Sequence, residues 1–223
     1  MERAQLARMV DLTLLSPTAT PGQIAMLCGE AVALDVAAIC ISPSQLPLPA
    51  AALPPQIAVC TVVGFPSGAH RSCIKAAEAA QAVQDGATEI DMVIDLGAAT
   101  AGRWDLVTKD IEAVRQAVPS PTVLKVIIES GALRDDEAII KACEAAEHAG
   151  ADFVKTSTGF HPDGGATLHA VSVMARAVGG RLGVKAAGGI ADTQSAQAMI
   201  QAGATRIGCS NGRAIIEGLE HSG

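Results

Sequence analysis

One short pattern recurs three times along the chain, and it is the feature that most restricts the possible folds. Each copy follows an Ala-rich helical stretch and leads into a β-branched run; the copies are QDGATEID (84–91), HAGADFVK (148–155) and QAGATRIG (201–208). The glycine of each copy stands just after a helix end, where a left-handed residue commonly closes the last turn. Successive copies are about two βα units apart, since one unit takes roughly 30 residues. The chain therefore alternates helices and strands.

Strand-like apolar runs fill the intervals between these copies. Eight are predicted, at 10–14, 36–41, 57–63, 89–94, 122–128, 152–157, 182–187 and 206–210. Helices are expected near 20–33, at 136–149 behind the acidic pair Asp135–Asp136, and as a short segment before the first strand. Eight alternating units in a chain of 223 residues predict an α/β fold, a (β/α)8 TIM barrel, with an open doubly wound sheet as the alternative. No linker or low-complexity segment divides the chain, so residues 1–223 are expected to form a single domain.

The composition restricts the class of protein. Hydrophobic residues make up 49% of the chain and charged residues 17%, below the usual ~25%, so a large core is expected. A net charge of −7 argues against non-specific nucleic-acid binding. The N-terminal residues match neither a signal peptide nor a membrane span, and the six cysteines form no C-x-x-C or zinc-like spacing. We expect a cytoplasmic protein with reduced thiols, no metal site and no membrane partner.

Several charged residues interrupt the apolar strands. Asp91, Lys125, Lys155 and Lys185 stand on the predicted fourth to seventh strands, and barrels place functional side chains at the C-terminal ends of strands. If Lys155 and Lys185 both point inward, burial and mutual repulsion should lower the pKa of each. A neutral lysine can attack a carbonyl and form a Schiff base, with Asp91 as the nearest acid/base group. The alternative is structural pairing of the lysines with acids such as Asp91 or Glu129.

Two glycine-rich segments follow the last two strands. They are AAGGI (186–190) and GCSNG (208–212), and barrels often bind phosphate at these loops through backbone N–H groups. Ser210 and Asn211 offer further donors, although an ordinary capped turn explains either loop alone. Asp11 and Thr13 are candidates for the barrel mouth, or for capping the next turn. Cys40 is either a mouth residue open to an unsaturated aldehyde or a buried inert thiol.

The order of several long motifs resembles that of the deoxyribose-phosphate aldolases, a family of class I aldolases. The resemblance covers roughly residues 9–218 and rests on DLTLLxPxAT (11–20), AAICI (37–41), CTVVGFPxG (60–68), EIDMVID (89–95), LKVIIE (124–129), DFVKTSTGF (152–160), VKAAGGI (184–190) and RIGCS (206–210). It implies a (β/α)8 barrel that uses no metal or organic cofactor and often forms homodimers. The implied reaction is the reversible cleavage of 2-deoxy-D-ribose 5-phosphate to D-glyceraldehyde 3-phosphate and acetaldehyde, a step of deoxyribose phosphate catabolism.

The resemblance also implies roles for individual residues. Lys155 matches the Schiff-base lysine, Lys185 the second lysine that perturbs its pKa, and Asp91 the acid/base aspartate. Phosphate contacts are implied at Gly159, Gly188, Gly189 and Ser210, and Thr158 belongs to the same substrate-binding loop. Where the family commonly has a second serine, this chain has Asn211, and it lacks the C-terminal tyrosine of some relatives.

Two other functions are open at this point. One is a metal-dependent aldolase or a phosphosugar isomerase on the same barrel. The other is a non-catalytic phosphosugar-binding protein.

Overall fold

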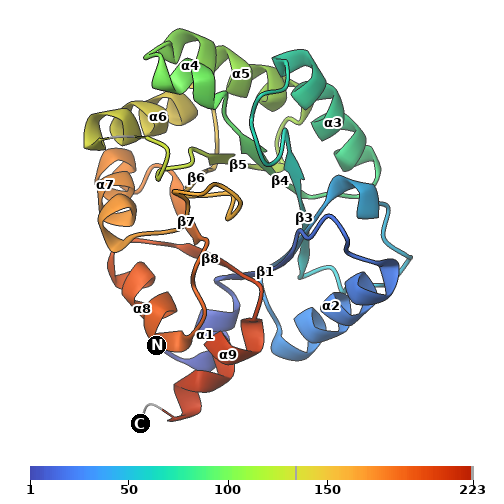
Figure 1. Cartoon of the computed structure of the whole chain (residues 1–223). Coiled ribbons are helices and arrows are strands. Elements are labelled where there is room, and N and C mark those ends of the chain that lie inside the picture. Colours follow the sequence, from blue (N-terminus) through green and yellow to red (C-terminus); the bar gives the residue numbers. More distant parts are fainter. Residues whose placement is uncertain (134, 222–223) are drawn as a thin grey trace.

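Eight parallel strands close into a barrel in the computed structural model, which describes residues 1–133 and 135–221 (Figure 1). The strands pair in chain order, and the eighth pairs with the first. Their bounds are β1 (Val10–Leu14), β2 (Ala38–Ile41), β3 (Ala58–Val63), β4 (Glu89–Val93), β5 (Val123–Ile127), β6 (Phe153–Lys155), β7 (Gly183–Ala187) and β8 (Arg206–Cys209). All eight predicted strands are present, and the closed barrel rules out the open sheet.

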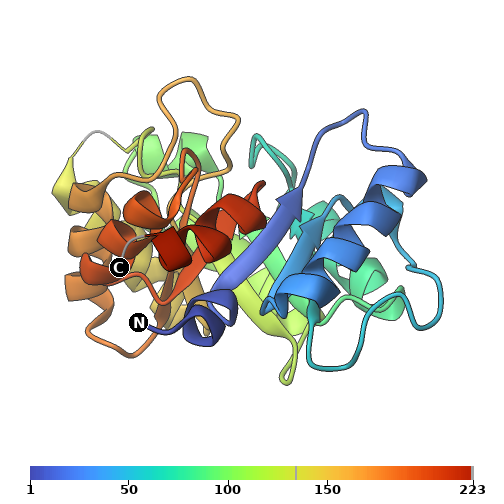
Figure 2. The same cartoon turned by 90° about the horizontal axis from the view of Figure 1, so that it is seen from below.

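Helices surround the barrel on its outer side, as Figures 1 and 2 show. They are α1 (Arg3–Ala7), α2 (Pro21–Leu34), α3 (Ser72–Gln84), α4 (Leu96–Thr100), α5 (Trp104–Ala117), α6 (Asp136–His148), α7 (Leu168–Val178), α8 (Thr193–Gln201) and α9 (Gly212–Ile216), with 3-10 turns η1 (Pro43–Gln45) and η2 (Glu217–His221). The predicted short helix before the first strand is α1. Among the described helices, none combines the length and the apolar character that crossing a membrane requires.

The helix ends follow the signals in the sequence. Gly86, Gly150 and Gly203 have φ angles of 99°, 79° and 115°, and each directly follows the last residue of α3, α6 or α8 and its cap. A side chain at such an angle is strained, so glycine ends these helices at little cost. Asp135 is the N-cap of α6, because its carboxylate accepts a hydrogen bond from the backbone N–H of Ala138.

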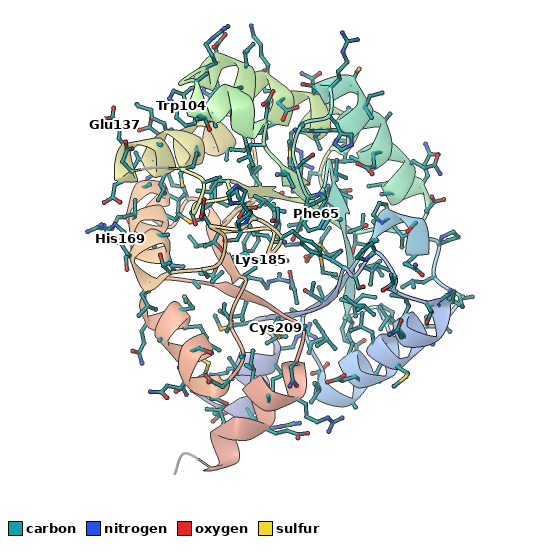
Figure 3. The ribbon with its side chains drawn as sticks, viewed as in Figure 1. Phe65, Trp104, Glu137, His169, Lys185 and Cys209 are labelled. Atoms are coloured by element: carbon teal, nitrogen blue, oxygen red, sulfur yellow. The ribbon has the colours of Figure 1, made fainter. Side chains whose placement is uncertain are left out.

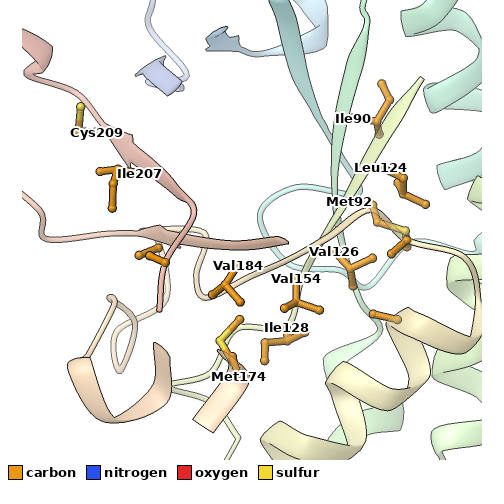
Figure 4. Packing of buried hydrophobic residues seen from close by; sticks show 14 of the residues in the cluster. Ile90, Met92, Leu124, Val126, Ile128, Val154, Met174, Val184, Ile207 and Cys209 are labelled. Carbon is orange, nitrogen blue, oxygen red and sulfur yellow. The ribbon is translucent and has the colours of Figure 1, made fainter. Parts of the chain in front are cut away.

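The two faces of each strand have different partners. Side chains such as Ile90, Met92, Leu124 and Val126 point away from the barrel axis and are fully buried against the helices (Figure 4). The alternate residues point into the barrel, and Figure 3 shows Lys185 near its centre while Trp104 lies in the outer ring. This alternation is the two-residue period of a strand. It places every second residue of β4–β8 in the barrel interior.

The barrel interior has an apolar half and a charged half. On β2 and β3, the small side chains of Ala38, Cys40, Cys60 and Val62 pack together with Leu15 from the loop after β1. The charged inward residues all come from β1 and β4–β8 and are described below. Burying ionised side chains is costly unless they are paired, so the side chains of the charged half must form ion pairs with one another.

Candidate active site

A cavity of about 610 Å³ opens at the C-terminal ends of the strands. Its walls are the segments after β1, β6, β7 and β8, and its lining includes most of the predicted site residues: Thr13, Lys155, Thr158, Gly159, Gly188, Gly189, Ser210 and Asn211. Lys155 is the one lysine or arginine among the described residues of that lining, and only 3% of its surface is exposed. The cavity therefore presents one buried amine to a bound molecule.

Asp91 lies directly beneath this amine and is shared by three lysines. Lys155 Nζ donates to its Oδ2 at 2.8 Å, and Lys185 Nζ donates to the same oxygen at 2.7 Å. Lys125 Nζ donates to its Oδ1 at 2.8 Å. Asp91, Lys125 and Lys185 are fully buried. The predicted set of Asp91, Lys155 and Lys185 is thus brought into direct contact, with Lys125 as an added member.

A second group of charges lies beside the first. Asp11 is 2.5 Å from Lys185 Nζ and 2.7 Å from Arg206 Nη1. Glu89 is 2.6 Å from Lys125 Nζ and 3.5 Å from Arg206 Nη2. Arg206 also lies over the Phe153 ring, 5.5 Å from its centroid. The whole network joins four cationic side chains to three carboxylates.

The network determines the direction of two pKa shifts. Burial raises the pKa of Asp91, but the positive charges of Lys125, Lys155 and Lys185 outweigh it and hold that pKa well below its usual range. Burial lowers the pKa of Lys185, but the carboxylates of Asp11 and Asp91 outweigh it and raise that pKa. The predicted lowering at Lys185 is therefore wrong, because the sequence did not reveal two carboxylates around one ammonium.

Two of the three residues predicted at the mouth lie deeper than predicted. Thr13 lines the cavity, whereas Asp11, two residues earlier on the same face of β1, is fully buried among the charges. Cys40 is also fully buried, next to Cys60 on the adjacent strand, where the structure pairs the two residues in register. The buried-thiol interpretation of Cys40 fits this position. Each strand residue advances about 3.3 Å, so two residues separate the rim from the interior.

Backbone donors gather at the rim of the cavity. Gly159, Gly188 and Gly189 have φ angles of 82°, 93° and 81°, and within the described chain their N–H groups have no hydrogen-bond partner. Asn211 accepts a hydrogen bond from Ala214 N through Oδ1, at 3.1 Å, and so caps α9. Its amide nitrogen remains available as a donor, which gives this residue both a structural contact and a place in the cavity wall.

Several residues of the network had no predicted role. Cys60 donates to Asp91 Oδ1 at 3.1 Å, and Lys125, Glu89 and Arg206 form the ion pairs given above. Their positions follow from strand register, because Asp91 pairs with Lys125 and Lys185 pairs with Arg206. The sequence signal for Lys125, Glu89 and Arg206 is the same as for Lys155: a charged residue inside an otherwise apolar strand.

Comparison with known proteins identifies the family. The model of the DeoC/LacD family aldolases matches residues 7–218, which is nearly the whole chain. The chain belongs to the DeoC/LacD aldolase family. Proteins named deoxyribose-phosphate aldolase from Kocuria rhizophila and Nocardia farcinica are 60% and 56% identical to this DeoC/LacD aldolase. The alignments cover 98% of both chains for the first, and 97% of this chain and 96% of the relative for the second.

Solved structures of the same kind share the fold. An aldolase named QR15 is 38% identical, with a TM-score of 0.90, and the match covers 97% of this chain and 96% of that one. Deoxyribose phosphate aldolase from Aeropyrum pernix, described as a unique tetramer, is 32% identical with a TM-score of 0.89, covering 98% and 92%. The DeoC/LacD aldolase barrel described here therefore has close structural relatives among aldolases.

Proposed function

We propose that the chain is a deoxyribose-phosphate aldolase, a lyase that reversibly cleaves 2-deoxy-D-ribose 5-phosphate to D-glyceraldehyde 3-phosphate and acetaldehyde. The observation that carries the proposal is the contact of Lys155 with Asp91 at the floor of the cavity, 2.8 Å from Nζ to Oδ2. The high identity to proteins named for this activity supports the same substrate.

In the proposed reaction, the neutral amine of Lys155 attacks the open-chain aldehyde carbon and forms a carbinolamine. Loss of water gives a protonated imine. The C3 hydroxyl then loses its proton to the water beside Asp91 and becomes the aldehyde carbonyl, while the bond between C2 and C3 breaks; its electron pair forms the enamine, and glyceraldehyde 3-phosphate is released. Protonation of the enamine carbon and hydrolysis of the new imine release acetaldehyde and restore Lys155. Asp91 holds the imine cation in place, and we infer that it passes protons through a water.

The ion pairs distinguish Lys155 from the other two lysines and favour it as the nucleophile. Four cationic groups face three carboxylates, so one neutral amine makes the described network neutral. Lys125 lies within 4 Å of three carboxylates and Lys185 of two, whereas Lys155 has a single carboxylate partner in the described chain. Lys155 therefore has the fewest carboxylate partners of the three lysines, and it is also the lysine that reaches the cavity.

The unpaired N–H groups at the rim supply a site for the phosphate. Gly159, Gly188 and Gly189 have no side chain to block a close approach, and Ser210 and Asn211 add side-chain donors. Fixing the phosphate here, on the loops after β6, β7 and β8, orients the sugar so that its aldehyde end meets Lys155.

A direct assay tests the proposal. The purified protein is incubated with 2-deoxy-D-ribose 5-phosphate, and acetaldehyde and glyceraldehyde 3-phosphate are measured with coupled dehydrogenases, with and without EDTA. We expect both products in equal amounts and no effect of the chelator. Loss of activity with EDTA would favour a metal-dependent aldolase. Tight binding of the phosphosugar without either product would favour a non-catalytic binding protein.

Replacing Lys185 should change the pH dependence of the reaction. Its ammonium is bonded to the same Asp91 oxygen as Lys155, so it disfavours a second positive charge there. In Lys185→Met we expect kcat/KM to fall by about 100-fold and the acid limb of its pH profile to move to higher pH. Lys141→Met, at a half-exposed lysine of α6, is the matched control. An unmoved acid limb in the Lys185 variant would remove this role.

Asn211 provides a test of phosphate recognition. Asn211→Asp keeps the oxygen that caps α9 but places a negative charge in the cavity wall. We expect KM for the phosphorylated sugar to rise by about tenfold or more, since like-charge repulsion of 1.4 kcal/mol corresponds to tenfold. Asn211→Ser retains a capping oxygen and a donor and should change KM much less. If Asn211→Asp raised the KM for unphosphorylated 2-deoxyribose by the same factor, the phosphate would have to bind away from Asn211.

We also propose a cytoplasmic location and assembly as a homodimer. All six cysteines are free, including the exposed Cys73, which suits a reducing compartment. Met26 and Val32 of α2 are large apolar side chains with 76% and 47% of their surface exposed, and such residues commonly lie in subunit contacts. Sedimentation equilibrium of the purified chain tests the assembly.

A further inference from the structure

The connection between β6 and α7 is the longest wall of the cavity and contains no helix or strand. It runs from 156 to 167 and carries Thr158, Gly159 and Phe160 to the cavity. Loops of this length without secondary structure are uncommon inside compact domains, and they usually serve a function. The loop must be held firmly if its backbone is to meet a substrate in one geometry.

Glu129, just after β5, supplies the contact that holds it. Its carboxylate accepts the Thr158 backbone N–H at 3.1 Å (Oε2) and 3.3 Å (Oε1), and the Thr158 hydroxyl donates to Oε2 at 2.5 Å. Glu129 is fully buried, and it takes part in none of the ion pairs found in the described chain. The interpretation that Glu129 pairs with a lysine is therefore wrong; its hydrogen bonds come from the loop.

The backbone at Glu129 is held in an unfavourable conformation. Its φ angle is 50°, in the left-handed region that side chains other than glycine rarely adopt. The residues on either side of Glu129 keep their backbone hydrogen bonds to the neighbouring segment. Ile128 N donates to Lys155 O at 3.0 Å, and Ser130 N donates to Thr156 O at 2.8 Å. Such strained positions persist where the surroundings fix them, and they occur often at functional sites. Here the turned residue aims its carboxylate at the loop.

Hydrogen bonds of the Thr158 side chain also fix the backbone on both sides of Gly159. Because the Thr158 hydroxyl gives its proton to Glu129, its oxygen is free to accept the Phe160 N–H, at 3.1 Å. Gly159 therefore stands between two residues whose backbone N–H groups are fixed. Its own N–H has no partner in the described chain and lies in the cavity wall.

We propose that Glu129 is a positioning residue for recognition of the phosphate, acting through Thr158 to hold the Gly159 N–H toward the bound phosphate. This inference rests on the proposed aldolase function and adds to it a residue that does not touch the substrate. A role limited to folding would weaken all substrates alike. A positioning role weakens the phosphorylated substrate selectively.

The test compares two substrates in the Glu129→Gln variant. An amide of the same shape presents a donor where the carboxylate accepted, so it loses at least one bond to Thr158. We expect KM for 2-deoxy-D-ribose 5-phosphate, and the inhibition constant of inorganic phosphate, to rise by about tenfold with kcat changed by less than about threefold. The value of kcat/KM for unphosphorylated 2-deoxyribose should stay within about twofold of the wild-type value.

A second variant tests the proposal if Glu129→Gln does not fold. Thr158→Val removes only the hydroxyl and should raise the phosphate inhibition constant in the same direction, with Thr158→Ser nearer the wild type. Glu144→Gln, the same change at a half-exposed residue of α6, is the matched control. Equal losses on both substrates, or an unchanged phosphate inhibition constant in folded variants, would overturn the proposal. A wild-type protein that cleaves neither sugar would instead refute the proposed function.

Discussion

Borohydride reduction in the presence of acetaldehyde is expected to leave a two-carbon adduct on Lys155 and to inactivate the protein. Lys155 is the lysine of the charged network that lines the cavity, so a carbonyl compound meets its Nζ first. Reduction converts the imine to a stable secondary amine that survives digestion. Peptide mass spectrometry of the segment containing DFVKTSTGF locates the adduct. Lys125 and Lys185 are fully buried and do not line the cavity, so they should remain unmodified.

The matching variant, Lys155→Met, should have the largest effect on activity. Without the amine no imine forms, and removal of a catalytic nucleophile costs on the order of 10⁴- to 10⁶-fold in kcat. Methionine has a similar length, and Lys125, Lys185 and Arg206 still face the three carboxylates, so the fold should survive. Circular dichroism checks this. Substantial activity in the variant, or an adduct on another lysine, would contradict the imine mechanism at Lys155.

The strands and helices were readable from the sequence because their signals are local. β-branched runs, the Gly-Ala pairs after α3, α6 and α8, and the Asp135 cap depend on neighbouring residues only. Strand ends were less accurate: the run at 152–157 yields the short strand β6, which ends at Lys155, and the loop to α7 begins at Thr156. The closed barrel was predicted from the number of βα units. Barrel closure is a property of the whole chain, but local patterns predict it once all eight units are detected.

The partners of each charged residue were not readable in the same way. Lys155 and Lys185 lie on neighbouring strands and pair in register, so both point into the barrel, and this part of the site was predicted. The contacts of Lys185 with Asp11, and of Asp91 with Lys125, depend on how strands distant in sequence align. The sign of a buried pKa shift depends on those contacts, which explains the wrong prediction for Lys185. Glu129 was missed as a loop contact for the same reason.

Replacing Asp91 should damage both activity and stability. Its carboxylate accepts bonds from three lysines, so Asp91→Asn leaves buried ammonium groups facing a neutral amide whose nitrogen cannot accept. Breaking a buried pair by removing one partner costs about 3–5 kcal/mol. We expect the free energy of unfolding, from urea titration at pH 7, to fall by about that amount, and kcat to fall by about 10²- to 10⁴-fold. Asp105→Asn, at an exposed ion pair, is the matched control.

The pH dependence of stability separates the charge of Asp91 from its shape. Since the folded-state pKa of Asp91 lies well below the usual aspartate value of 3.8, its contribution to stability is present above about pH 4 and is lost as the pH falls through the folded-state pKa. The raised pKa of Lys185 acts in the opposite direction: its contribution is present below the usual lysine value of 10.5 and is lost as the pH rises through the folded-state pKa. The wild-type free energy of unfolding should therefore decline on both sides of this range.

In Asp91→Asn the decline of the free energy of unfolding at acid pH should be shallower, because the amide does not titrate. The decline at alkaline pH should also be smaller, because Lys185 keeps only Asp11 as a partner. If the variant loses stability equally at every pH, the loss reflects packing around residue 91, and the ion pairs with the lysines are not its cause.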